Sequence, residues 1–383
     1  MRRQQSQARP GWEQIVEQQG LGFHRNVPQG EDGRPYWDES VHYSFTMAQV
    51  EDLERVVEEL HGMCLDVVDY VIEKRRYSDF RIPEWLHGPI AASWRRHDPH
   101  AYGRFDLCYD GRSHAKLLEY NADTPTSLVE SSVVQWHWMT NTHPDADQWN
   151  SIHERLIDRW KYALGGGRLH LAHTGTETSG EDELTVAYMA ETATAAGIQV
   201  TTLPVEAIGW DTGRRTFVDA QHKPIGRLFK LYPWEWMVAD EFGAAAIDAQ
   251  ARTPWVEPLW KMLLSNKALL ALLWELYPDH PNLLPAYLDG PRGMDSYIVK
   301  PLLGREGASM KIVTPAGAEH TPGEYGDEGH VFQELWPLPE FDGWRPVLGA
   351  WVVGDEAAGL GIRETRGLIT GNTSSFVPHL IEG

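Results

Sequence analysis

The sequence has little cysteine, no long apolar run and no excess of positive charge. Cys64 and Cys108 are the only two cysteines among 383 residues. Two cysteines cannot build a disulfide framework, which predicts a reducing compartment. No run of about 18 apolar residues occurs that would form a transmembrane helix, and no apolar segment follows the first five residues as in a secretion signal. We therefore expect a soluble cytoplasmic protein.

The formal net charge of −21 argues against nucleic acid or an anionic membrane as the main partner, because both require a basic surface. It suits small-molecule substrates that include a cationic amine, such as a polyamine. With 42% hydrophobic and 23% charged residues, the chain falls in the ordinary globular range and is long enough for two or three domains. Its 17 tryptophans are either core and interface anchors or platforms for stacking sugars.

Two short runs, residues 102–107 and 117–123, alternate apolar and polar side chains as β-strands do. Residues 110–113, Asp-Gly-Arg-Ser, are typical of a turn. The sequence therefore predicts an antiparallel hairpin. We place Tyr109 opposite Lys116, which fixes the register of every other pair.

This register separates the hairpin side chains into two faces. One face carries four apolar or aromatic side chains: Phe105, Leu107, Leu118 and Tyr120. The other face carries four polar side chains: Arg104, Asp106, Glu119 and Asn121. The polar face is either a solvated surface or a binding site.

The composition of the polar face favours a metal site. Asp106 and Glu119 are like charges in opposite positions, which destabilises a sheet unless a cation lies between them. With the amide oxygen of Asn121, they form a set of hard ligands suited to Mg²⁺. Arg104 beside them suits a phosphate or a developing negative charge.

Several motifs along the chain match one known family. They are Tyr-Gly-Arg-Phe-Asp at 102–106, the segment 117–126, and the shorter segments 231–235, 265–267, 299–301, 304–307 and 361–364. In these motifs the chain resembles the glutathionylspermidine synthase-like family of ATP-grasp acid–amine ligases. It most resembles short stand-alone members that lack the amidase domain.

The resemblance implies a mixed α+β and α/β fold of the ATP-grasp type, as in glutathione synthetase. The residues independently predict a capped helix from Thr46, a helix at 152–164 and a strand–helix–strand unit between 169 and 203. We expect three parts: an N-terminal helical region with the hairpin (1–165), a small Rossmann-like layer (166–255), and the ATP-grasp region (256–383).

The segment after the hairpin, residues 123–126, reads Asp-Thr-Pro-Thr. Thr124 is predicted to cap a helix that starts at Pro125 and runs through Trp138. The resemblance places the hydroxyls of Thr124 and Thr126 near the acid substrate, although both threonines also suit a purely capping role. Glutathione-using members have serines at both positions.

Glu181 and Asp182 open the helix predicted for 181–196. Acidic residues favour a helix N-terminus on dipole grounds alone. The resemblance implies in addition that they hold the protonated amine substrate.

Two lysines are candidates for binding ATP phosphates. Lys267 lies at the start of a strongly apolar helix, where a positive charge is unfavourable unless an anion is near. Lys300 ends a short strand, and a glycine-containing loop with Arg305 and Gly307 follows it. The resemblance assigns these four residues to the phosphates.

The resemblance implies further nucleotide contacts. These come from Arg104, Phe105 and Asp106 in the hairpin, Gln333, Glu334 and Leu335 beside the adenine, Arg363 near the phosphates, and Leu368, Ile369 and Thr370 at the closing segment. Without a nucleotide, these residues would be ordinary strand, turn and ion-pair residues.

The sequence analysis thus predicts an ATP- and Mg²⁺-dependent ligase that joins a carboxylate to an amine through an acyl phosphate and releases ADP and phosphate. Arg104 would stabilise the transition state. Two alternatives stay open: a relative that binds MgATP without ligating, and a glycoside hydrolase with Asp106 and Glu119 as its acid pair. The residues do not name the acid, the amine or the oligomeric state.

Overall fold

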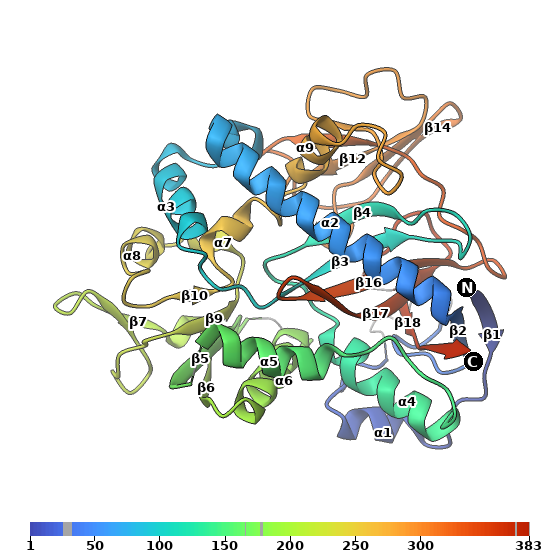
Figure 1. Cartoon of the computed structure of the whole chain (residues 1–383), viewed down its shortest axis with the longest axis horizontal. Coiled ribbons are helices and arrows are strands. Elements are labelled where there is room, and N and C mark those ends of the chain that lie inside the picture. The colour runs from blue at the N-terminus through green and yellow to red at the C-terminus, as the bar shows by residue number, and fades with distance from the viewer. Residues whose placement is uncertain (26–32, 165, 177–178, 372–373, 383) are drawn as a thin grey trace.

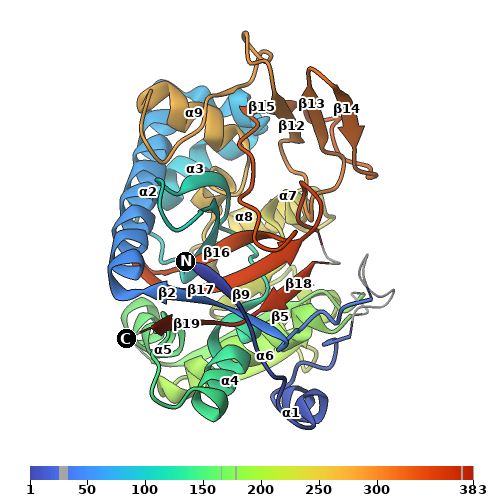
Figure 2. The same ribbon diagram turned by 90° about the vertical axis from the view of Figure 1, so that its right-hand side faces the viewer.

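The structure is a computed structural model that describes residues 1–25, 33–164, 166–176, 179–371 and 374–382 (Figure 1). Among the described residues it contains two five-stranded sheets, one four-stranded sheet and two smaller ones. Figures 1 and 2 show one five-stranded sheet in the middle of the molecule, between the other five-stranded sheet and the four-stranded sheet. The middle sheet therefore lies between the two other large sheets.

The middle sheet is antiparallel and has the order β18-β17-β16-β3-β4. Its strands are β3 (Tyr102–Cys108), β4 (Lys116–Asn121), β16 (Arg345–Val353), β17 (Glu356–Thr365) and β18 (Ser375–Val377). β16 and β17 form a second hairpin, with apolar runs on both sides of the turn at Gly354. Segments more than 200 positions apart in the sequence are thus neighbours.

The predicted register of the first hairpin is right on one side of a β-bulge and wrong on the other. Asp106 pairs with Glu119, as predicted. Beyond this pair Leu107 faces Leu117, so the predicted pairs Leu107–Leu118 and Tyr109–Lys116 are wrong by one residue. The bulge falls at Leu118, where one strand carries an extra residue and its carbonyl leaves the regular ladder.

α2 (Met47–Lys74) packs on β16 and β17 of the middle sheet (Figure 1). It begins at the predicted capping box, in which Thr46 and Gln49 bond each other's backbone. Its apolar stripe is buried, including Cys64. Both cysteines are free and buried.

The described residues before α2 contribute two strands to a small sheet. β1 (Arg2–Gln5) and β2 (Val41–Thr46) are antiparallel, and β19 (His379–Glu382) runs parallel to β2. The two termini therefore meet in one small sheet (Figure 1). The pairing partner of β2 comes from the far end of the chain, which no local pattern reveals.

The strand, helix and strand predicted between 169 and 203 are β5 (Arg168–His173), α6 (Glu181–Ala195) and β6 (Gln199–Pro204). β9 (Leu228–Leu231) and β10 (Trp255–Val256) complete a parallel sheet of order β10-β9-β5-β6. α5 (Ile152–Leu164) packs beside α6, as Figure 1 shows.

The second five-stranded sheet has the order β11-β15-β12-β13-β14 and is antiparallel. Its strands are β11 (Ala286–Tyr287), β12 (Tyr297–Pro301), β13 (Lys311–Thr314), β14 (Gly317–His320) and β15 (His330–Glu334). The predicted helix after Lys267, α9 (Ala268–Leu276), packs on β15 and α2. Lys267, directly before α9, and Lys300, on β12, thus both belong to this part of the molecule.

The helix after the first hairpin starts later than predicted. Residues 125–127 are not helical, and the helix begins at Leu128. Thr124 is therefore not its cap, and the prediction that Pro125 is the first helical residue is wrong. Ser127 has a φ of 68°, which interrupts any helix from Pro125.

The remaining elements are short or peripheral. They are α1 (Trp12–Gln18), η1 (Arg76–Phe80), α3 (Glu84–Arg95), the π-helical η2 (Glu130–Val134), α4 (Gln135–Thr142), η3 (Val205–Ala207), β7 (Gly209–Asp211), β8 (Thr216–Val218), α7 (Trp234–Met237), α8 (Gly243–Asp248) and η4 (Leu259–Met262). Within the described ranges, no helix is both long enough and apolar enough to cross a membrane.

Candidate active site

Asp106 lies between two arginines on the middle sheet. Arg104 Nε donates to Asp106 Oδ1 at 2.9 Å, and Arg363 Nη2 donates to Asp106 Oδ2 at 3.0 Å. Arg363 lies on β17, two strands away from β3. The intervening β16 has Gly349 opposite Asp106, where a Cβ would lie 3.0 Å from Arg104 Cδ. A glycine at this position therefore leaves room for the Arg104 side chain.

Glu119 is paired with the predicted phosphate lysine Lys267. Lys267 Nζ lies 3.2 Å from Glu119 Oε2 and donates to the Gly304 carbonyl at 2.6 Å. Burial would raise the pKa of Glu119, but the charges of Lys267 and Lys300 outweigh it and lower the pKa to about 2. Glu119 is therefore a carboxylate at neutral pH.

Lys300 is held at the bulge of the hairpin. Its Nζ donates to the Leu118 carbonyl at 2.8 Å and to Gln333 Oε1 at 2.7 Å, and Gln333 Nε2 donates to the Leu117 carbonyl at 3.1 Å. Burial lowers the pKa of Lys300 to about 8, against the opposing charge of Glu119. The bulge that breaks the predicted register thus supplies the acceptor for this lysine.

The three predicted metal ligands fit an oxygen-coordinated divalent cation. Asp106 and Glu119 are opposite each other, and Asn121 is opposite Arg104 on the same face. Asn121 Nδ2 is buried and has no hydrogen-bond partner among the described residues, so the fold's own bonds do not use this amide nitrogen. Two carboxylates and an amide are the donor set that Mg²⁺ prefers.

Phe105 lies on the opposite face of β3. Its ring stacks on Tyr120 with a centroid separation of 3.9 Å and is fully buried. Any contact of Phe105 with a nucleotide would therefore use its backbone.

Arg305 joins the glycine-containing loop to two other segments. Its Nη1 donates to Thr124 Oγ1 at 2.9 Å, and its Nη2 donates to Glu235 Oε1 at 2.6 Å. Its guanidinium also lies 5.4 Å from the ring of Trp236. The motif at 231–235 and the threonine predicted near the acid substrate therefore meet at Arg305.

The predicted closing segment lies against the same loop. Gly307 has a φ of 72°, and a Cβ there would lie 2.8 Å from Ile369 Cγ2 and 3.1 Å from the Thr370 carbonyl oxygen. Thr370 Oγ1 is buried without a partner in the described part of the chain, and Leu368 is exposed. Glycine is therefore required at 307 both for its backbone conformation and for this contact.

The candidate substrate residues divide into two groups. Arg104 Nη1 donates to the Thr126 carbonyl at 2.6 Å, and the Thr126 hydroxyl bonds Glu181. Burial raises the pKa of Glu181. Asp182 instead accepts from Thr174 Oγ1 at 2.5 Å. Thr126 and Glu181 are thus linked to Arg104. The neighbouring Glu177, like residues 372–373 that follow the closing segment, lies outside the described residues.

Sequence reasoning missed Glu130. Its carboxylate is buried on the helix after the hairpin and accepts from the Tyr36 hydroxyl at 2.6 Å. Burial, with the charge of Glu181 nearby, raises the pKa of Glu130 to about 7. The sequence signal for a buried carboxylate was available: Glu130 is the acidic residue in the mostly uncharged stretch Leu-Val-Glu-Ser-Ser-Val-Val.

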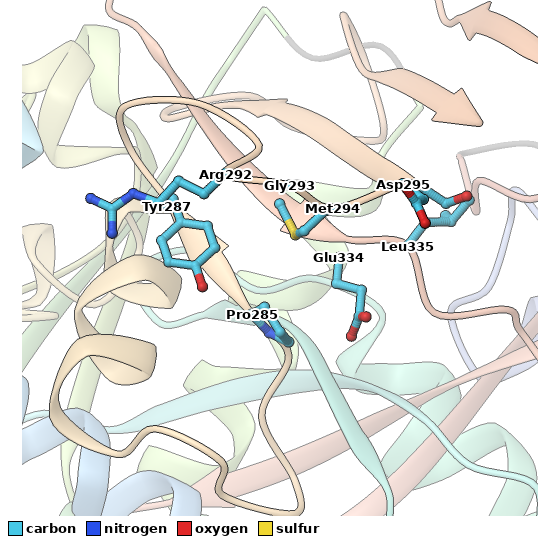
Figure 3. A pocket seen from close by; sticks show the side chains of 9 residues that line it. Pro285, Tyr287, Arg292, Gly293, Met294, Asp295, Glu334 and Leu335 are labelled. Carbon is cyan, nitrogen blue, oxygen red and sulfur yellow. The ribbon is translucent and has the colours of Figure 1, made fainter. Parts of the chain in front are cut away.

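An open pocket lies beside the predicted adenine edge (Figure 3). It is lined by Pro285, Tyr287, Arg292, Gly293, Met294, Asp295, Ser296, Glu334 and Leu335. The Glu334 amide donates to the Pro285 carbonyl at 2.8 Å and the Leu335 amide to the Ser296 carbonyl at 3.1 Å. These two amides are therefore already used, whereas Gln333 faces Lys300 instead of the pocket.

Comparison with known proteins adds independent evidence. Residues 3–382 match the family described as glutathionylspermidine synthase preATP-grasp. A protein of Haemophilus influenzae named "Putative acid--amine ligase" is 43% identical over an alignment of 375 residues that covers 94% of this chain and 94% of its own. Trypanothione synthetase of Crithidia fasciculata is 29% identical over 83% of this chain and 53% of its own.

The bifunctional glutathionylspermidine synthetase/amidase of Escherichia coli is 26% identical over 89% of this chain and 59% of its own. The chain thus spans little more than half of these two longer relatives. A glutathione synthetase-like effector of Globodera pallida in its apo form has a similar fold, with a TM-score of 0.53 and 10% identity over 98% of this chain and 100% of its own. Because the family match covers almost every residue, the chain belongs to the glutathionylspermidine synthase family of carbon–nitrogen ligases.

Proposed function

We propose that this ligase uses MgATP to join a carboxylate to an amine, through an acyl phosphate and with release of ADP and phosphate. The observation that carries the proposal is the convergence of two opposed carboxylates with four basic side chains from four different segments of the chain. These are Arg104 and Arg363 at Asp106, and Lys267 and Lys300 near Glu119. The basic side chains outnumber the carboxylates, and this excess of positive charge suits a site that exchanges internal ion pairs for a metal and a triphosphate.

Asp106, Glu119 and Asn121 would hold Mg²⁺. When bound, the ion would neutralise phosphate charge and so favour attack on the γ-phosphorus. Lys267 and Lys300 would turn from Glu119 and Gln333 to the phosphate oxygens. Arg305 would contact the phosphates from the loop, where it lies beside Thr124. Arg104 would stabilise the charge that develops on the transferring group.

We propose further that the acid lies near Thr124 and Thr126, and the amine near Glu181. Thr124 contacts Arg305 and Thr126 contacts Arg104, so both threonines lie next to proposed phosphate residues. The Thr126 hydroxyl bonds Glu181 in turn, so Glu181 lies next to the proposed acid position. The names of two relatives include glutathionylspermidine and trypanothione, which supports a peptide-like acid and a polyamine-like amine as the first substrates to test.

The test is a screen for ADP release over pairs of carboxylates and amines, with the product identified by mass spectrometry. The proposal predicts ADP that depends on both substrates and on Mg²⁺, and loss of at least about 100-fold in kcat/KM in Asp106→Asn, which corresponds to nearly 3 kcal/mol of lost stabilisation. Asp240→Asn is the control, because this exposed aspartate accepts from the Tyr232 hydroxyl and, among the described residues, has no bond to the basic side chains of the site. Full activity in Asp106→Asn would refute the proposed metal site.

The nonligating alternative predicts a different result when the ADP screen is combined with a melting curve. A protein that binds MgATP without ligating would show a rise in melting temperature with MgATP but no amine-dependent ADP. The glycoside hydrolase alternative has no support, because the family is one of carbon–nitrogen ligases and both carboxylates are engaged by basic side chains.

A further inference from the structure

Two histidines and an aspartate converge at the edge of the middle sheet. His61 lies on α2, His100 precedes β3, and Asp355 lies in the turn between β16 and β17. His61 Nε2 lies 3.2 Å from Asp355 Oδ1, and His100 Nε2 lies 3.3 Å from the same oxygen. One ligand atom from each residue lies within 4.8 Å of the other two. Three elements that are distant in the sequence therefore direct potential metal ligands to one point.

We propose that His61, His100 and Asp355 bind a divalent transition-metal ion of the zinc class, with water as a fourth ligand. Two imidazoles and one carboxylate are a common ligand set for zinc. Around a tetrahedral zinc with bonds of about 2.0–2.1 Å, neighbouring ligand atoms lie about 3.3 Å apart. The two nitrogen–oxygen distances at Asp355 match this spacing.

The imidazoles are held in place by neighbouring groups, as at known metal sites. His61 Nδ1 lies 3.1 Å from the Tyr120 hydroxyl, so a proton on Nδ1 would leave Nε2 free for a metal. The His100 carbonyl accepts from Arg159 Nε at 2.6 Å, and its ring packs edge to face on Trp260. His100 Nδ1 is buried and has no partner within the described ranges.

Burial and access are also suitable. His61 is 2% exposed and His100 is 7% exposed, whereas Asp355 lies at the surface with a 62% exposed side chain. An ion can thus enter past Asp355 and bind the two buried nitrogens.

This site is distinct from the candidate active site. Tyr120, which contacts His61, alternates along β4 with Glu119 and Asn121 and therefore points to the opposite face. The ion would join α2 to the turn of the β16–β17 hairpin. Its expected role is to stabilise the middle sheet, and it does not depend on the proposed reaction.

The test uses untagged, chelator-treated full-length protein and Zn²⁺ alone. We expect calorimetric titration and elemental analysis to give one bound Zn²⁺ per chain and melting curves to show an increase in melting temperature. Asp355→Ala and His100→Ala should each weaken binding by at least about 100-fold, and Tyr120→Phe by about tenfold through the ring it orients.

Two control variants locate the ion. His114→Ala removes an exposed histidine, and Asp106→Asn alters the candidate magnesium site; both should bind Zn²⁺ like the wild type. Asp355→Ala changes an exposed side chain and should fold. It therefore tests the site even if His100→Ala, which changes a buried side chain, fails to fold. Absence of Zn²⁺ uptake by the wild type would overturn the proposal, as would unchanged affinity in Asp355→Ala.

Discussion

The ammonium group of Lys300 donates to Gln333 across the pair of strands β12 and β15, with a nitrogen–oxygen distance of 2.7 Å. Gln333 in turn donates to the Leu117 carbonyl of the hairpin at 3.1 Å. Lys300 itself reaches the next carbonyl, that of Leu118, at 2.8 Å. The two five-stranded sheets are therefore joined at the lysine proposed to bind phosphate.

Gln333→Leu should raise KM for ATP by about tenfold, because the loss of one charge-assisted hydrogen bond removes about 1.5 kcal/mol of positioning from Lys300. Steady-state kinetics with saturating acid and amine would measure KM for ATP. Gln199→Leu is the matched control, since Gln199 is exposed on β6 and should leave KM unchanged. An unaltered KM in Gln333→Leu would show that Lys300 needs no such anchor.

ATP binding should weaken as the pH rises above about 8. The pKa of Lys300 is lowered to about 8 by burial, so the side chain is charged below this pH and loses its proton above it. KM for ATP is then expected to increase through pH 8–9 in the wild type. Lys300→Arg keeps its charge across the range and should lack the inflection. An identical pH profile in both proteins would contradict the assignment of Lys300.

Glu119 should contribute to stability in acid. Its pKa is lowered from 4.5 to about 2, mainly because Lys267 and Lys300 outweigh the effect of burial. A lowered carboxyl pKa gives stability that is complete above the unfolded pKa and is lost as the pH falls from about 4.5 towards 2. Urea unfolding should show a flatter pH dependence over this window in Glu119→Gln. The control Glu241→Gln changes an exposed residue and should keep the wild-type slope.

The close contact at Gly307 gives a prediction for the loop. Gly307→Ala introduces a Cβ 2.8 Å from Ile369 Cγ2 at a φ of 72°, so both the loop and the closing segment must move. We expect KM for ATP to rise at least about tenfold, which corresponds to a loss of about 1.4 kcal/mol or more of binding free energy.

Gly197→Ala controls for the backbone effect alone. Gly197 has a similar φ of 83°, and nothing lies within 4 Å of the position of its Cβ. Gly197→Ala should lose about 1 kcal/mol of unfolding free energy from its left-handed backbone, Gly307→Ala should lose at least as much, and only Gly307→Ala should lose ATP affinity. Equal KM values in the two variants would remove the loop from the nucleotide site.

Local sequence patterns predicted much of the hairpin and its surroundings. Alternation placed Asp106 opposite Glu119, the capping box placed the start of α2, and the apolar run after Lys267 predicted α9. Each of these depends on residues within a few positions of one another. The division of the chain into three parts stays a prediction.

The remaining features depend on contacts between distant segments. The bulge at Leu118 shifts the register by one residue, and its carbonyl is bonded by Lys300, which lies 182 positions away. Arg363 reaches Asp106 only because β16 lies between their strands. The sequence around Thr124 favours a helix cap, yet this side chain bonds Arg305 instead. Tertiary contacts thus override local preference at the candidate site.

The most direct test of the account is a crystal structure of the protein with Mn²⁺ and a nonhydrolysable ATP analogue. We predict an anomalous peak bonded to Asp106, Glu119 and Asn121, with the phosphates in contact with Lys267 and Lys300. A nucleotide bound elsewhere would contradict the account. So would a bound nucleotide with no metal at Asp106, Glu119 and Asn121 and with Lys300 still bonded to Gln333.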